Sequence, residues 1–151
     1  MRLAVQKARE GIQNGQTPFG ACIVSSDAKV LACAHNVVWL TTDITAHGEV
    51  NTIREACRNA GAIDLSGCTI YSTTEPCPMC FAAIHWAKIK RIVYGASIAD
   101  AQAAGFNELA ISNRVMKDEG GSPVEIDGGC LREECRALFQ EWKDSGKARI
   151  Y

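Results

Sequence analysis

The sequence has no excess of basic residues and no long apolar run. Its 16 Lys and Arg residues are balanced by 17 Asp and Glu residues, which gives a formal net charge of −1. Proteins that grip folded RNA usually carry a basic excess, so we expect no nucleic acid partner. No apolar run reaches the ~20 residues of a membrane-spanning helix, and the N-terminus does not resemble a signal peptide. We therefore expect a cytoplasmic protein that does not contact a membrane.

Internal repeats, low-complexity segments and linkers are also missing from the sequence. The length of 151 residues suits one domain with a sizeable core. Apolar residues make up 47% of the chain and charged residues 22%, as is ordinary for globular proteins. We predict a single domain over residues 1–151.

Cysteine, by contrast, is abundant, with eight residues. Small secreted domains use that many cysteines for disulfides, but a well-patterned core makes disulfides unnecessary. Two of the eight form a C-x-x-C pair. We expect the others to pack mainly as small apolar side chains: Cys22, Cys33, Cys57, Cys68, Cys130 and Cys135. This usage fits a reducing cytoplasm.

Two short motifs organise the chain: an H-x-E motif that begins at His47 and a P-C-x-x-C motif that ends at Cys80. One imidazole (His47) and two thiolates (Cys77 and Cys80) would bind a tetrahedral zinc ion and leave one coordination position open, as in catalytic sites. A water at that position becomes acidic enough to act as hydroxide near neutral pH. Glu49 is not needed as a ligand, so it can carry protons between this water and a leaving amine.

The spacing within each motif supports this interpretation. The two cysteines lie three residues apart, so at the start of a helix they share one face. The flanking prolines suit a helix that begins there, and its positive N-terminal end favours thiolates. His47 and Glu49 can reach one pocket only from the opening turn of a helix, for which Thr45 is the expected N-cap.

Other interpretations of the cysteine pair are weaker. Alone, C-x-x-C fits a redox pair or half of a structural zinc site equally well. The preceding proline and glutamate, together with the upstream H-x-E motif, favour a zinc deaminase. A zinc ion that merely holds two helices together would not explain Glu49 beside an open coordination position.

Hydrophobic periodicity and turn residues predict an α/β fold. Expected helices cover residues 2–14, 47–60, 79–86 and 131–143, and expected strands cover residues 21–24, 30–34, 68–71, 91–96 and 124–126. Expected loops cover residues 37–44 and 97–109, and a mobile polar segment covers residues 116–122. Alternating strands and helices imply parallel neighbours with right-handed crossovers. The site should then lie at helix N-termini beyond the strand ends.

From about Leu3 to its C-terminus, the chain resembles the cytidine deaminase superfamily. The resemblance implies a three-layer α/β/α domain with a mixed five-stranded sheet and one Zn²⁺ ion per subunit. Local features are similar to the guanine deaminase family: residues 17–21 (T-P-F-G-A), Asn36, residues 77–87, residues 100–107 and the final Tyr151. The tRNA adenosine deaminase family shares both motifs, but we would not expect its members to show the Ile-x-Trp-Ala run or a terminal tyrosine.

The guanine deaminase resemblance implies the hydrolysis of guanine at carbon 2 to xanthine and ammonia. Glu49 would carry protons to the leaving amine, and Asp100 would be a second proton carrier on the other side of the base. Asn36 would bind the purine by hydrogen bonds, and Phe19 would form a wall of the pocket. Taken alone, Asn36 is also a common turn residue, and Asp100 could be a loop-capping aspartate.

The same resemblance implies a homodimer in which the tail, residues 147–151, packs over the partner's site. Tyr151 would be a lid there, and Trp86 would lie at the pocket or at the dimer contact. The chain departs from the family pattern at Gly48, where alanine is usual, and at Asn107, where an acidic residue is common. Gly48 would give the pocket floor slightly more room.

Several substrates stay open at this stage. Deamination of a wobble adenosine in tRNA would need a basic groove for the anticodon stem, whereas the sequence offers only scattered basic residues such as Lys88, Lys90 and Arg91. Guanosine, cytosine and the triazine ammeline are further candidates with a similar amidine edge. Pocket shape decides among them.

Overall fold

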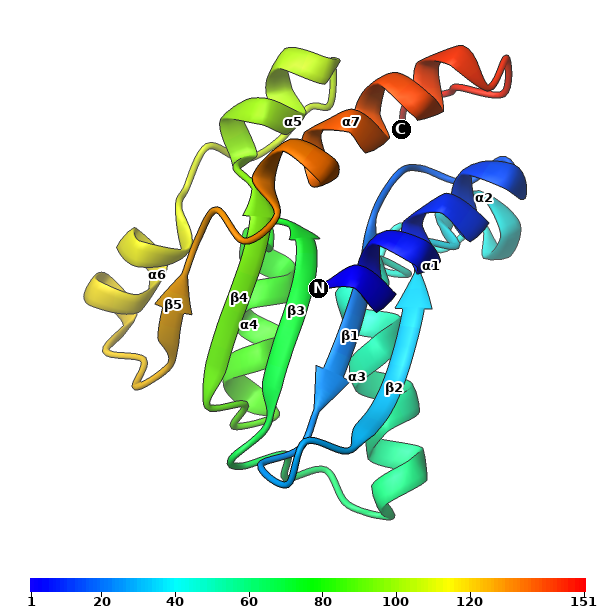
Figure 1. Ribbon diagram of the computed structural model, residues 1–151. Coiled ribbons are helices and arrows are strands. Elements are labelled where there is room, and N and C mark those ends of the chain that lie inside the picture. The colour runs from blue at the N-terminus through cyan, green and yellow to red at the C-terminus, as the bar shows by residue number, and fades with distance from the viewer.

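The computed structural model describes residues 1–151 and is built around a mixed five-stranded sheet (Figure 1). The strands are β1 (Gly20–Val24), β2 (Val30–His35), β3 (Thr69–Thr74), β4 (Arg91–Ala96) and β5 (Glu125–Asp127). Their spatial order is β2-β1-β3-β4-β5. β1 pairs antiparallel with β2 and β3, whereas β3, β4 and β5 run parallel.

Helices cover both faces of the sheet, so the predicted three-layer architecture is confirmed (Figure 1). One face carries α1 (Arg2–Gln13) and α7 (Arg132–Asp144), and the other carries α3 (Gly48–Ala60) and α4 (Pro78–Trp86). A buried apolar cluster lies on each side, one including Ile23, Ile70, Phe81, Ile84 and Ile92, and the other including Val5, Ile12, Leu138, Phe139 and Trp142. None of the helices combines the length and the apolarity that crossing a bilayer requires.

Three short helices lie in segments where we expected loops or a mobile chain: α2 (Val38–Thr41), α5 (Ile98–Ala104) and α6 (Asn113–Gly120). Those expectations are therefore wrong in part. α5 begins with a capping box between Ser97 and Asp100, and α6 begins at Ser112, whose hydroxyl accepts the Val115 N–H. Capping side chains satisfy the free N–H groups of a first turn, so such helices form without a long hydrophobic repeat.

Cys22 and Cys33 form a disulfide between β1 and β2. We expected both to pack as small apolar side chains, and that expectation is wrong for this pair. The two residues are direct partners in the antiparallel register, which brings their side chains together on one face of the sheet. The other six cysteines are free.

Candidate active site

The predicted zinc ligands converge at the N-termini of α3 and α4. His47 is the N-cap of α3, and Cys77 is the N-cap of α4, with Cys80 in the first turn. Thr45 is not the N-cap that we expected, because its side chain bonds to Asp43 instead. Both motifs thus lie in opening helical turns, as their spacing requires.

The separations of the donor atoms fit a zinc ion. His47 Nδ1 lies 3.7 Å from Cys77 Sγ and 3.6 Å from Cys80 Sγ, and all three donors lie within 4.8 Å of one another. A tetrahedral ion with Zn–S bonds of ~2.3 Å and Zn–N bonds of ~2.0 Å holds its donors ~3.6 Å apart. The ligand set leaves a fourth position for water or substrate.

The electrostatics of α4 prepare the thiolate form that zinc requires. Hydrogen bonding to Cys80, assisted by His47, lowers the pKa of Cys77 to about 4, although burial opposes this change. The positive end of the helix dipole acts in the same direction. These interactions favour the thiolate form of Cys77, which is the form that binds zinc.

Glu49 lies in the first turn of α3 and is 7% exposed. The Ser72 hydroxyl donates to its carboxylate over 3.1 Å. Burial, followed by the negative charge of Cys77, raises the pKa of Glu49. A buried carboxyl group next to a metal site, but outside the ligand set, is suited to accept and release protons.

Glu108 is a second carboxyl group at this site, and our sequence analysis missed it. It lines a pocket of about 350 Å³ together with His47, Cys77 and Tyr151, and it also lines a small cavity together with Glu49. Burial and the negative charges of Cys77 and Glu49 raise the pKa of Glu108 to about 7. The sequence contained a signal for Glu108, which directly follows Asn107, the position where the family resemblance led us to expect an acidic residue.

Of three further predicted residues, Phe19 lines the small cavity, whereas Asn36 and Gly48 line neither cavity. Asn36 is buried just after β2, where its Oδ1 accepts the Val38 N–H over 3.0 Å. Phe19 lines the cavity beside Glu49 and packs edge-on against Phe106, with ring centroids 4.8 Å apart. At Gly48, a Cβ atom would lie 3.2 Å from the Phe19 carbonyl oxygen, so the glycine allows a close backbone approach.

The C-terminal tail packs over the pocket of its own chain. The Arg149 guanidinium lies 4.1 Å from the centre of the Trp39 ring, whose Nε1 donates to the Arg149 carbonyl oxygen over 3.3 Å. Tyr151 Oη accepts from Asn36 Nδ2 at 2.7 Å and lies 3.4 Å from His47 Nε2. Burial raises the pKa of Tyr151 to about 12. The structure thus places the tail over the pocket of its own chain, whereas the family resemblance implied that it packs over the partner's pocket.

Comparison with known proteins accords with this geometry. Residues 1–96 match the model of the cytidine and deoxycytidylate deaminase zinc-binding region. The chain belongs to this deaminase family. It is a zinc-dependent hydrolase with the ligands His47, Cys77 and Cys80.

Individual relatives point to two kinds of substrate. The deaminase is 38% identical to a guanine deaminase of Bacillus subtilis (strain 168), over 100% of this chain and 96% of the relative. It is 32% identical to a tRNA-specific adenosine deaminase of the same organism, over 98% and 91% of the two chains. A solved guanine deaminase of Nitrosomonas europaea superposes with a TM-score of 0.85 at 26% identity, covering 93% of this chain and 81% of the other.

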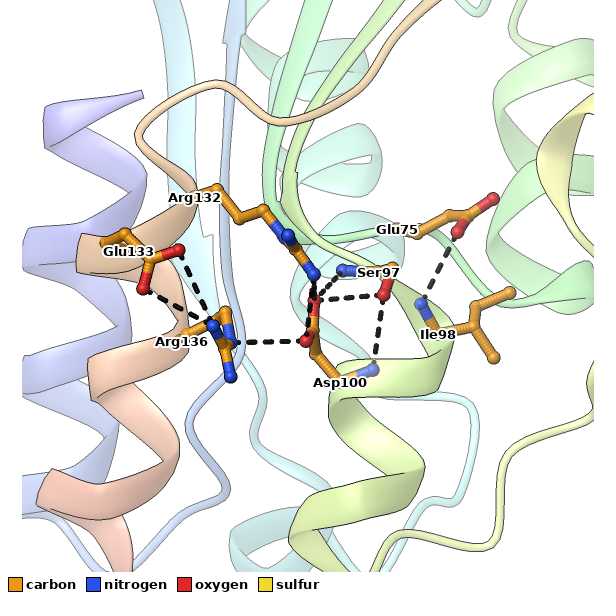
Figure 2. A network of polar contacts seen from close by, with 7 residues as sticks. All are labelled: Glu75, Ser97, Ile98, Asp100, Arg132, Glu133 and Arg136. Atoms are coloured by element: carbon orange, nitrogen blue, oxygen red, sulfur yellow. Dashed lines mark hydrogen bonds and ion pairs between the residues drawn. The ribbon is translucent and has the colours of Figure 1, made fainter.

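Asp100 lies outside the pocket of this deaminase. Figure 2 shows its carboxylate at the start of α5, where it accepts from the backbone and hydroxyl of Ser97. It also pairs with Arg132 at 3.1 Å and Arg136 at 3.2 Å, both on α7. Although burial opposes the change, the contacts with Ser97 and Arg132 lower the pKa of Asp100. The expected second proton carrier is therefore a capping aspartate that ties α5 to α7.

Glu75, beside the P-C-x-x-C motif, also caps helix N-termini, as Asp100 does. It is buried and accepts the backbone N–H groups of Ile98 at 3.4 Å and Asn113 at 2.9 Å (Figure 2 shows the first). One carboxylate thus holds the starts of α5 and α6 next to the zinc ligands. The segment that carries Glu108 runs between these two helices, so Glu75 helps to place it.

Trp86 is also outside the pocket. It is the last residue of α4, nine residues after Cys77, which corresponds to about 13 Å along the helix axis. Its side chain is 81% exposed and lines a separate pocket of about 520 Å³ with His85 and Ser122. Of its two predicted positions, the substrate pocket is excluded, and the dimer contact stays a prediction.

Proposed function

We propose that this deaminase hydrolyses free guanine to xanthine and ammonia. The main support is the position of the C-terminal tail, whose Tyr151 lines the same pocket as His47, Cys77 and Glu108. A free base is small enough to enter a pocket that such a lid partly covers. A nucleotide within a tRNA loop must bring its sugar and phosphates to the same place. The similarity to a guanine deaminase over the full chain supports the same substrate.

Zinc, when bound by His47, Cys77 and Cys80, supplies the positive charge that makes a water molecule acidic enough to be a nucleophile. Glu49 then takes a proton from the attacking water at its carboxylate and delivers it to the leaving amino group. Its hydrogen bond from Ser72 keeps the carboxylate in place during this exchange. Glu49 does not need to move between the two steps, because the water oxygen and the amino nitrogen are both bonded to the same carbon during the reaction.

We assign the second proton carrier to Glu108 in place of Asp100. Glu108 lines the cavity next to Glu49 as well as the larger pocket next to Tyr151, so its carboxyl group can reach a base that binds between them. Phe19 forms an apolar wall, backed by Phe106. Such a wall excludes water, which strengthens the electrostatic interactions inside the site. Tyr151 would bind the polar edge of the purine, and Asn36 would act through it by holding its hydroxyl in place.

The wobble adenosine of tRNA is the second candidate, because the tRNA-specific adenosine deaminase of Bacillus subtilis aligns with nearly the whole chain. Removal of residues 147–151 separates the two functions. Without the tail, xanthine formation should fall, because the pocket loses a wall and two polar contacts. If the truncated protein instead forms inosine in tRNA and neither form converts guanine, the tRNA assignment is correct.

A further inference from the structure

The two ring nitrogens of His47 have different neighbours. Nδ1 faces both sulfur atoms of the ligand set, at 3.7 and 3.6 Å. A nitrogen that binds a metal carries no proton, so a neutral imidazole bound through Nδ1 has its proton on Nε2. Tyr151 Oη, at 3.4 Å, is the one protein group within hydrogen-bond distance of Nε2.

The Tyr151 hydroxyl is itself held in a fixed orientation. Asn36 Nδ2 donates to it over 2.7 Å. The amide of Asn36 cannot turn over without loss, because its Oδ1 accepts the Val38 N–H at 3.0 Å and the residue is fully buried. The nitrogen of this amide must therefore face Tyr151, whose oxygen acts as an acceptor toward it. The backbone of α2 thereby fixes an acceptor oxygen beside His47.

We propose that Tyr151 is a positioning residue for the zinc ligand His47. Its hydroxyl oxygen accepts the Nε2–H of His47, which selects the tautomer that binds zinc through Nδ1 and fixes the orientation of the ring. Metal-bound histidines generally use their second nitrogen in this manner, and loss of the acceptor weakens metal binding. The last residue of the chain thus contributes to zinc retention, whichever base is the substrate.

The packing of the tail allows the role of the Tyr151 hydroxyl to be tested separately from the packing of its ring. The Tyr151 ring lies edge-on to Trp39 at 6.0 Å and tilted to His47 at 5.9 Å between ring centres. Tyr151→Phe keeps both ring contacts and removes only the hydroxyl. Tyr71, on β3, supplies a matched control, because its hydroxyl makes no hydrogen bond within the protein and lies outside the pocket.

The test is zinc affinity, measured by competition with a chromogenic chelator. We expect the dissociation constant of zinc to rise about 10- to 100-fold in Tyr151→Phe and to stay unchanged in Tyr71→Phe. Cobalt substitution gives a second measurement, in which the visible bands of the bound ion should shift only in Tyr151→Phe. Unchanged affinity and unchanged bands in Tyr151→Phe would overturn the proposal. Equal losses in both variants would overturn it as well, since they would reflect general destabilisation.

Discussion

Glu49 and Glu108 line one small cavity beside Cys77, although one belongs to α3 and the other follows α5. Each raises the cost of a negative charge on the other, because like charges at close range favour protonation. This relationship suits both carboxyl groups to the proton transfers that we propose for them.

The first prediction concerns Glu108. Glu108→Gln keeps the size of the side chain but removes its titratable group, so guanine turnover should fall about 100-fold or more. Zinc content should not change, because Glu108 is not a ligand. Steady-state xanthine formation and metal analysis check both points. Glu119→Gln, on the exposed surface of α6, is the control and should behave like wild type. Full turnover in Glu108→Gln would show that Glu108 only lines the pocket and carries no proton.

The second prediction concerns Glu49. Glu49→Gln should retain zinc and lose turnover by on the order of a hundredfold or more, because the water and the amine lose their proton carrier. Binding of guanine should persist, and equilibrium dialysis with the inactive variant measures it. If Glu49→Gln turns over guanine at the wild-type rate, the proposed proton route is wrong.

Asp100 should affect stability and not chemistry. Its side chain is 12% exposed, but its Arg132 and Arg136 partners are about half exposed, so Asp100→Asn should cost about 1 kcal/mol in unfolding free energy. The folded state lowers the pKa of Asp100. Its contribution is therefore present above the pKa of the unfolded chain and is lost as the pH falls through the folded pKa.

Urea unfolding at neutral pH and at about pH 3 checks this expectation, since the difference between Asp100→Asn and wild type should shrink in acid. The turnover number for guanine should stay near that of wild type. A large fall in turnover without a loss of stability would restore Asp100 as a proton carrier.

The fourth prediction concerns assembly. The family resemblance leads us to propose a homodimer, which light scattering of the intact chain tests. Because Tyr151 contacts His47 of its own chain, mixing Glu49→Gln with a protein that lacks residues 147–151 should restore no activity. Recovered activity in the mixture would show that one chain's tail completes the other chain's site.

The sequence predicted the zinc ligands well because each of the two motifs is local, although the motifs themselves lie about 30 residues apart. His47, Cys77 and Cys80 each lie in an opening helical turn, and two-residue and three-residue spacings fix which side chains can share a pocket. The sheet and its flanking helices were also predictable, because the hydrophobic periodicity of long segments indicates which face is buried.

Asp100 and Glu108 show where sequence reasoning failed. Both lie in a segment interpreted as a loop, in which periodicity does not define which residue faces the site. The Ser97–Asp100 capping box was visible in the sequence, and it would have predicted α5 and placed Asp100 at its start. The position of Glu108 depends on the turn at Gly105, where φ is +110°, and on contacts from Glu75 that no local pattern shows.

The most direct test of the central claim is ammonia release by the purified zinc protein. Guanine should be the preferred substrate by kcat/KM in a panel that also contains guanosine, cytosine, ammeline and tRNA, and xanthine should form in equal amount to ammonia. Deamination of adenosine in tRNA, with no release from guanine, would contradict the proposed substrate and leave only the zinc chemistry in place.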